Sequence, residues 1–303
     1  MTADDELAVE HELHGPVLAW YEAEARDLPW REPDCPAWHV LISEVMLQQT
    51  PVARVLPVWQ EWVRRWPTPA DLASVSAGEA IRDWGRLGYP RRALRLHEAA
   101  RAIVDRHHGQ VPSDHAELLA LPGIGTYTAA AVASFAFGQR HAVVDTNVRR
   151  VFARTISGDA QAAPALTVAE SRLAASLLPD LPSRAARWGV AVMELGALIC
   201  TARAPRCESC PVSSRCRWQL TGAPPHTGPV RRGQAWSGTD RQIRGAILAV
   251  LRSAPTPVDG ATLVDEVPNS ALRDEFQRAR CLDGLVADGL VEPLPGDRYQ
   301  LPG

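Results

Sequence analysis

Apolar residues recur at three- and four-residue spacing through residues 15–220, which is the pattern of helices that each bury one face. Proline and glycine divide this pattern into segments, and no stretch alternates apolar and polar positions for long enough to predict a sheet. We therefore predict an all-α main body. The segments predict helices at 37–49, 51–66, 76–87, 91–107, 116–121, 126–137, 147–157, 168–178 and 183–199, with Thr50 as the N-cap of the second and Pro51 as its first residue.

The pattern changes after a Pro/Gly/Ser-rich linker at residues 221–238. Residues 239–303 predict a helix, a short extended piece, two further helices and two strands, an order typical of a winged helix. With an acidic tail at 1–14 and the main body at 15–220, the chain is predicted to have four parts. Within the last part, the helices are expected at 240–252, 260–266 and 270–288, the extended piece at 257–258, and the strands at 290–293 and 298–301 with a turn at 295–297.

The composition of the 303 residues, 46% hydrophobic and 22% charged, excludes global disorder and allows one large or two ordinary domains. The longest apolar run, around 129–137, is far shorter than the roughly 18 residues of a membrane-spanning helix. The N-terminal segment is acidic and lacks the apolar stretch of a signal peptide. We expect no membrane association and a cytoplasmic location.

Charge is unevenly distributed along the chain. The net charge is −3, but residues 1–30 hold eight acidic side chains against one arginine, so the remainder is net positive and can present a basic face to DNA. All 32 basic side chains are arginine. Because no lysine is present, any mechanism that needs a lysine Schiff base is excluded.

Four cysteines fall within seventeen residues: Cys200, Cys207, Cys210 and Cys216. Without an export signal, disulfides are the weakest interpretation. Four thiolates suit a structural zinc ion, although only one pair has the two-residue spacing common in zinc modules. They also suit a [4Fe–4S] cluster, whose irons lie further apart and accept wider spacing. Spacing alone leaves zinc and the cluster open, and Cys35 and Cys281 are expected to be ordinary buried thiols.

A glycine turn links two predicted helices in the sequence LPGIGTYT, residues 121–128. Gly123 and Gly125 permit close approach of another backbone, and the unpaired amides that open the following helix suit a phosphate. An ordinary turn between two helices is the alternative. The narrow form of the motif favours a contact with the DNA backbone.

Two carboxylates are candidates for acid and base chemistry. The helical neighbours of Glu44 are largely apolar, so we expect burial to raise its pKa and keep it protonated as a general acid. Asp145 follows a short apolar stretch and precedes a helix. A capping role is its simplest interpretation, but Asn147 is the better cap candidate, which leaves Asp145 available for chemistry. Nothing local in the sequence shows that Glu44 and Asp145 meet.

Taken together, these segments resemble the MutY family of adenine DNA glycosylases, in the helix–hairpin–helix superfamily that includes endonuclease III. The resemblance covers residues 15–220 in order and is carried by LPWR (28–31), SEVMLQQT (43–50), LGY (87–89), LPGIGTYTA (121–129), VVDTNVRRV (143–151), and MELGALIC (193–200) with the cysteine spacing. It implies a helix–hairpin–helix glycosylase fold with a [4Fe–4S] cluster on all four cysteines of the 200–216 loop, to which the residue pattern adds a small α+β domain of winged-helix type at 239–303.

The resemblance also implies a reaction. Adenine opposite 8-oxoguanine or guanine is flipped out of double-stranded DNA into a cleft where Glu44 and Asp145 face each other. Glu44 then protonates adenine N7, and Asp145 stabilises the oxocarbenium-like sugar until water adds, as in retaining glycosidases. Tyr127 stands where bifunctional relatives have a Schiff-base lysine, which implies a monofunctional enzyme. Further implied positions are Asn147 near the sugar, Trp30 and Arg31 at the adenine pocket, Gln48, Gln49 and Thr50 beside the opposing lesion, and Leu87 and Tyr89 at the wedge that enters the base stack.

Two features depart from the family. Val190 stands where many members have a glutamine or glutamate against adenine, and no Nudix-like domain that reads 8-oxoguanine follows the cluster. The preference for 8-oxoguanine over guanine is therefore open, and the C-terminal domain is a candidate surface for DNA or for a protein partner. A glycosylase for thymine opposite guanine and a non-catalytic DNA-binding protein are the alternatives. We expect a monomer associated with the nucleoid.

Overall fold

The computed structural model describes residues 12–228, 238–265 and 275–303, which form two compact units. Unit 1 contains residues 12–40, 113–119 and 125–228, and unit 2 contains residues 41–112, 120–124, 238–265 and 275–303. Both units are therefore assembled from segments that lie far apart in the sequence. Parts of the predicted tail, the linker and the helices at 260–266 and 270–288 lie outside the described residues.

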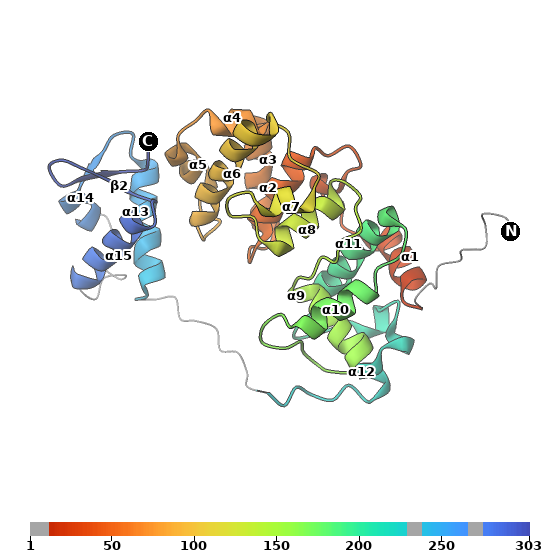
Figure 1. The fold of residues 1–303 in the computed structure, drawn as a ribbon. Helices are drawn as coiled ribbons and strands as arrows, with labels where there is room; N and C mark the ends of the chain where they lie inside the picture. Colours follow the sequence, from red (N-terminus) through yellow and green to blue (C-terminus); the bar gives the residue numbers. More distant parts are fainter. Residues whose placement is uncertain (1–11, 229–237, 266–274) are drawn as a thin grey trace. The chain divides into compact units, whose positions relative to one another are not determined.

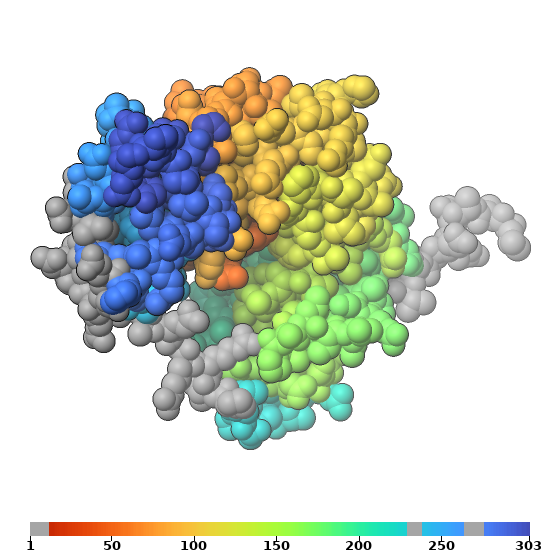
Figure 2. Space-filling model, turned by 60° about the vertical axis from the view of Figure 1, so that its left-hand side comes forward, coloured from red at the N-terminus to blue at the C-terminus, as the bar shows by residue number. Residues whose placement is uncertain are grey.

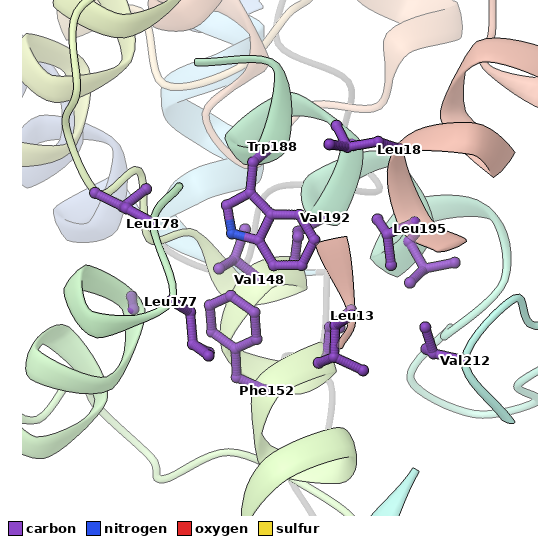
Figure 3. Packing of buried hydrophobic residues seen from close by; sticks show 14 of the residues in the cluster. Leu13, Leu18, Val148, Phe152, Leu177, Leu178, Trp188, Val192, Leu195 and Val212 are labelled. Carbon is purple, nitrogen blue, oxygen red and sulfur yellow. The ribbon is translucent and has the colours of Figure 1, made fainter. Parts of the chain in front are cut away.

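Unit 1 is held together by an apolar core around Trp188 of helix α11 (Pro182–Leu198), whose side chain is 2% exposed. Helices α1 (His14–Glu24) and α9 (Thr146–Phe152) pack against α11, and Figure 3 shows the Trp188 ring beside Val148 and Phe152. This packing fixes the N-terminus of α9 relative to the segment that follows α11. It thereby positions two regions that the sequence marks as functional, Asp145 and the cysteine loop.

Unit 2 is organised by tryptophan rings in a layer of helices. The ring of Trp62 in α3 (Val52–Arg65) meets the ring of Trp66 edge-on at 4.8 Å and that of Trp84 at 5.4 Å. Around them pack α4 (Pro69–Ala73), α5 (Ala77–Trp84) and α6 (Arg91–His107). Most of α2 (Ala37–Leu47), including Glu44, also belongs to this unit.

The C-terminal module, which we define as residues 238–265 and 275–303, is part of unit 2. Its elements are drawn in shades of blue in Figure 1. Its strands form one antiparallel sheet in the order β1-β3-β2, with Tyr299 opposite both Val258 and Pro293. The predicted order of elements is confirmed for the described residues. The elements are α13 (Asp240–Ser253), β1 (Val258–Asp259), α14 (Gly260–Asp265), α15 (Glu275–Ala287), β2 (Glu292–Leu294) and β3 (Arg298–Gln300).

The module is docked on α5. The Gly78 N–H donates to the Pro302 carbonyl at 2.7 Å, and Arg252 Nε donates to the Ile81 carbonyl at 3.0 Å. Figure 2 shows the dark-blue atoms near the C-terminus against the orange atoms of the region that includes α5. Since Ile81, Leu251 and Leu301 are each at most 7% exposed, apolar burial accompanies these hydrogen bonds.

Most predicted helices are present, but several ends differ. Thr50 does not cap α3; Pro51 occupies that position and the helix begins at Val52. The Thr50 hydroxyl instead donates to the Leu87 carbonyl at 3.4 Å, so it serves a contact between two loops. The helix predicted to reach residue 87 ends at Trp84 because Gly85 has a positive φ of 54°.

Several short elements were not predicted, and others are shorter than expected. Residues 153–157, predicted as the end of an α-helix, form a π-helix after α9. None of the described helices is long and apolar enough to cross a membrane. The remaining elements are a 3₁₀ turn (Pro29–Arg31), α7 (His115–Leu119), α8 (Thr126–Phe135), α10 (Val168–Ser176), 3₁₀ turns at Cys207–Ser209 and Ser213–Arg215, and α12 (Arg217–Leu220).

Candidate active site and cluster loop

Asp145 is the N-cap of helix α9, so the prediction that Asn147 takes this role was wrong. One carboxylate oxygen of Asp145 accepts the Val148 N–H at 2.7 Å, and the other accepts the Asn147 side-chain amide at 2.7 Å. Burial raises the pKa of Asp145, while these two hydrogen bonds and the positive charge of Arg150 oppose the rise. Asp145 therefore combines the cap with a fixed orientation of its carboxyl group.

Arg150 connects this carboxylate to the cysteine loop, a role that the sequence analysis missed. Its guanidinium donates to Asn147 Oδ1 at 2.7 Å and to the Cys200 carbonyl at 2.7 Å. An unbroken series of hydrogen bonds thus runs from Cys200 through Arg150 and Asn147 to Asp145. The available signal was spacing, because Arg150 lies three residues after Asn147 on α9 and so shares its face.

The four predicted cysteine ligands lie in one loop after α11. The Cys216 thiol donates to the Arg154 carbonyl at 3.5 Å, and the Arg154 guanidinium donates to Cys200 Sγ at 3.3 Å. Arg154 is 3% exposed and lies over the Trp218 ring at 4.8 Å. A buried guanidinium thus donates a hydrogen bond to one of the four predicted ligand sulfurs.

This donor set fits an iron–sulfur cluster. Burial raises the pKa of Cys210 to about 11, and the charges of Cys200, Cys216 and Cys207 add to the rise, so the thiols are near enough for their thiolates to repel one another. Iron ions held here would remove this conflict, because their positive charge stabilises the thiolates that ligate them. Four thiolates at wide spacing in one loop are the ligands that a cluster of several irons takes.

Trp30 and Arg31, the predicted adenine-pocket residues, lie in unit 1 next to a buried carboxylate that was not predicted as functional. Glu194 of α11 is fully buried. The Arg26 guanidinium donates one hydrogen bond to each of its carboxylate oxygens, both at 2.7 Å, and the Arg31 guanidinium donates to one of them at 2.7 Å. Burial alone would raise the pKa of Glu194, but these hydrogen bonds outweigh it and lower the pKa to about 2. Val190, where the family contact departs, is one helical turn earlier on α11.

Glu44 is 5% exposed, which confirms the expected burial on an apolar helix face. Of its predicted neighbours on that face, Val40 and Leu41 are 3% and 0% exposed, while Leu47 and Gln48 are half-buried. Tyr127, in the first turn of α8, packs beside Ala130, Ala131 and Val143 in unit 1. Because Glu44 belongs to unit 2 and Asp145 to unit 1, the expectation that they face each other stays a prediction.

The predicted opposing-base and wedge residues come together in unit 2. Gln49 and Tyr89 both have positive φ, 56° and 47°, which is costly for residues with a side chain. Thr50 joins their two loops through its bond to the Leu87 carbonyl, and Gln48 belongs to the same segment. Tyr89 is 51% exposed, as a side chain that inserts into DNA requires.

The two glycines of the turn, Gly123 and Gly125, differ in backbone conformation and in the space around them. Gly123 has a φ of +73°, and a Cβ there would lie 2.4 Å from the Arg95 Cβ, so only glycine fits. Gly125 has an ordinary backbone and nothing within 4 Å of a Cβ position. Fold packing accounts for the first glycine and leaves the second open to a backbone approach from outside the protein.

Two family profiles match the chain: HhH-GPD superfamily base excision DNA repair protein over residues 42–174, and the iron–sulfur binding domain of endonuclease III over residues 200–216. The second match spans all four cysteines and supports a [4Fe–4S] cluster as the cofactor, while the assignment of these four thiols as its ligands stays a prediction.

Similar proteins agree with these profiles. Adenine DNA glycosylase from Mycobacterium tuberculosis is 53% identical over 290 residues, which cover 95% of this chain and 92% of that protein. Among solved structures, a thermostable thymine-DNA glycosylase has a TM-score of 0.62 at 30% identity, covering 69% of this chain and 95% of that chain. Endonuclease III in a non-covalent DNA complex has a TM-score of 0.57 at 27% identity, covering 68% and 92%. The chain therefore belongs to the MutY family of adenine DNA glycosylases, within the HhH-GPD superfamily of base excision DNA repair proteins.

Proposed function

We propose that this protein is the adenine DNA glycosylase of a base excision repair pathway, and that it removes adenine mispaired with 8-oxoguanine or guanine in double-stranded DNA. The observation that carries the proposal is the burial of Glu44, 5% exposed, within the segment SEVMLQQT. A carboxyl group on an apolar face is suited to hold a proton near neutral pH. The 53% identity to an adenine DNA glycosylase supports adenine as the base.

Glu44 and Asp145 have different roles in the proposed reaction. Glu44 protonates N7 of the flipped adenine, which makes the base a better leaving group. Asp145, held by the Val148 N–H and the Asn147 amide, stabilises the positive charge that develops on the sugar until water adds. Arg31, held by Glu194, and Trp30 line the adenine pocket, while Tyr127 supports Asp145.

The enzyme is monofunctional in this proposal. A lyase that cleaves the DNA strand through a lysine Schiff base needs a lysine nucleophile, and the chain contains none, which leaves its terminal amine as the one aliphatic amine. Tyr127 stands at the position where bifunctional relatives have that lysine, and a phenol cannot form a Schiff base. Borohydride reduction of the enzyme on substrate DNA is therefore expected to trap no covalent complex.

Binding to DNA involves the glycine turn and the cluster loop. Gly123 and Gly125 allow a phosphate to approach the amides that open α8, and Tyr89 enters the base stack. The bound [4Fe–4S] cluster supplies structural order to the loop, where the exposed Arg203 is available to a phosphate. We place the enzyme, as a monomer, on nucleoid DNA in the cytoplasm.

The test is single-turnover release of free adenine from duplexes with adenine opposite 8-oxoguanine, guanine or thymine. Glu44→Gln is expected to lower release by at least about a thousandfold, because the amide cannot donate the proton. Glu61→Gln, a change at an exposed residue of α3, serves as the matched control and should release adenine at the wild-type rate. No release by the wild type from any of these duplexes would overturn the proposal.

A second candidate is removal of thymine opposite guanine, because a thymine-DNA glycosylase shares the fold at 30% identity. A duplex with thymine opposite guanine, assayed in parallel, separates the two. Release of thymine rather than adenine would favour this candidate, whereas release of adenine alone excludes it.

A further inference from the structure

Arg92 is the second residue of α6, and its guanidinium contacts two loops of unit 2, at residues 48–50 and 87–89. It donates to the carbonyls of Val45 at 2.9 Å, Met46 at 3.0 Å and Gln48 at 2.5 Å. Two of these acceptors lie in the last turn of α2, whose last carbonyls have no partner inside the helix, and the third, Gln48, follows that helix. Arg92 thus closes the end of the helix that carries Glu44 one turn earlier.

The same guanidinium also binds both loops that carry the predicted DNA contacts. Its second terminal nitrogen donates to Thr50 Oγ1 at 3.0 Å and to the Gly88 carbonyl at 3.1 Å. It lies over the Tyr89 ring at 5.4 Å and over the Trp84 ring at 5.2 Å. One side chain therefore contacts the helix end, the 48–50 loop and the 87–89 loop at once.

The two loops hold backbone strain that needs such support. Gln49 and Tyr89 both have positive φ, a conformation that is unfavourable for a residue with a side chain. Each is flanked by an atom that Arg92 binds: Gln48 O and Thr50 Oγ1 on either side of Gln49, and Gly88 O before Tyr89. Strained residues persist where the surroundings fix them from several sides, as they do here.

We propose that Arg92 is a positioning residue that joins the 48–50 loop, predicted to lie beside the opposing base, and the 87–89 loop, predicted to carry the wedge, to helix α2. As a result, reading of the opposing base and insertion of Tyr89 act as one step. The inference deepens the proposed function and rests on it for the roles of Gln49 and Tyr89. Arg92 itself touches no reacting atom. Its effect on base release comes through the placement of the two loops.

The chemistry requires arginine and not merely a positive charge. The four N–H groups on the two terminal nitrogens of the planar guanidinium are shared among five acceptors in different directions, whereas Nε has no hydrogen-bond partner. A lysine ammonium has only three donors around one point. Arg92→Lys should retain the charge and the fold but lose part of this set. Arg92→Met keeps a side chain of similar length but can make none of these hydrogen bonds.

The first experiment compares single-turnover adenine release opposite 8-oxoguanine and opposite guanine for the wild type, Arg92→Lys and Arg92→Met. We expect release opposite 8-oxoguanine to fall about tenfold or more while release opposite guanine falls less, so the ratio of the two rates moves toward one. Arg101→Lys and Arg101→Met, at an exposed residue of the same helix, are the matched controls and should leave the ratio unchanged. Equal losses on both substrates would indicate a merely structural role and overturn the proposal.

The second experiment is a double-mutant cycle with Tyr89→Ala. If Arg92 acts by placing Tyr89, Arg92→Lys should have little further effect once Tyr89 is gone, and the two losses should not add. Fluorescence of 2-aminopurine placed beside the mispair reports base unstacking without needing catalysis, and it should rise less with Arg92→Lys than with the wild type. Additive losses, or unchanged fluorescence, would overturn the proposal. A wild type that unstacks the probe but releases no adenine would instead overturn the proposed function.

Discussion

The pKa of Asp145 is set by burial, which raises it, against the Val148 N–H, the Asn147 amide and the charge of Arg150, which lower it. In the proposed reaction Asp145 works as a carboxylate. Since protonation removes the charge that stabilises the sugar cation, activity should be lost as the pH falls through the raised pKa. The acid limit of the reaction therefore lies at a higher pH than an ordinary aspartate would give.

Asn147→Ala should move this acid limit further up in pH. The substitution removes the amide that stabilises the charged form of Asp145, while burial continues to favour the neutral form. A hydrogen bond to a charged group is worth about 1.5–3 kcal/mol, so we expect a shift of about one to two pH units in the acid limb of the single-turnover rate. Thr146→Ala, at the exposed neighbouring residue, should leave the profile in place. A downward shift in Asn147→Ala would contradict this account of Asp145.

Several residues that organise the site could not be predicted from the sequence because they act through distant backbone atoms. Arg92 binds carbonyls more than forty residues away, and Arg150 binds the Cys200 carbonyl. Glu194 was visible within MELGALIC, but its arginine partners are more than 160 residues earlier. Features that depend on local spacing were predictable, such as the burial of Glu44 on its helix.

At the scale of elements, periodicity predicted which segments are helices but often missed where they end. Helix α6 has the predicted bounds. It ends at His107 because the next two residues, His108 and Gly109, have positive φ and leave the helical conformation. Helix α3 begins one residue late because the Thr50 hydroxyl is used by a contact between loops. Helix ends are thus set partly by tertiary contacts, which a local pattern does not contain.

The glycine turn gives a paired prediction at this scale. Gly123→Ala should lower the free energy of unfolding by about 1–3 kcal/mol, because its φ is positive and the new Cβ would meet Arg95. Gly125→Ala should leave stability nearly unchanged, since its backbone is ordinary and the space around it is open. If Gly125 serves a phosphate, this variant should weaken DNA binding without a change in the denaturation midpoint. Equal losses of stability in the two variants would contradict the distinction.

At the scale of the whole molecule, the sequence predicted a separate C-terminal domain with the correct order of elements, but it held no sign that this domain is docked. Docking depends on contacts between residues about 170 or more positions apart, such as Arg252 with Ile81 and Pro302 with Gly78. The match to the Mycobacterium tuberculosis protein covers 95% of the chain, so that relative shares most of the module. A docked module adds buried surface to the unit that holds Glu44 and Tyr89.

The Gly78→Ala variant tests this docking, because docking decides whether the substitution raises or lowers the free energy of unfolding. In an exposed helix, alanine in place of glycine stabilises by up to about 1 kcal/mol. At Gly78 the new Cβ would lie 2.5 Å from the Pro302 carbonyl oxygen and 3.0 Å from the Leu301 Cβ, so the C-terminal segment has to move. We therefore expect chemical denaturation to show a loss of about 1–3 kcal/mol. Hydrogen exchange should also become faster at the amide of residue 78, because that amide donates to the Pro302 carbonyl in the docked module.

The matched control for this variant is Gly245→Ala, in α13, where nothing lies within 4 Å of the Cβ position. This substitution should stabilise the protein, because it gains helix propensity and meets no neighbour. If both substitutions stabilise equally, the C-terminal segment does not rest on α5, and the contribution of the module to unit 2 has to be sought in other contacts.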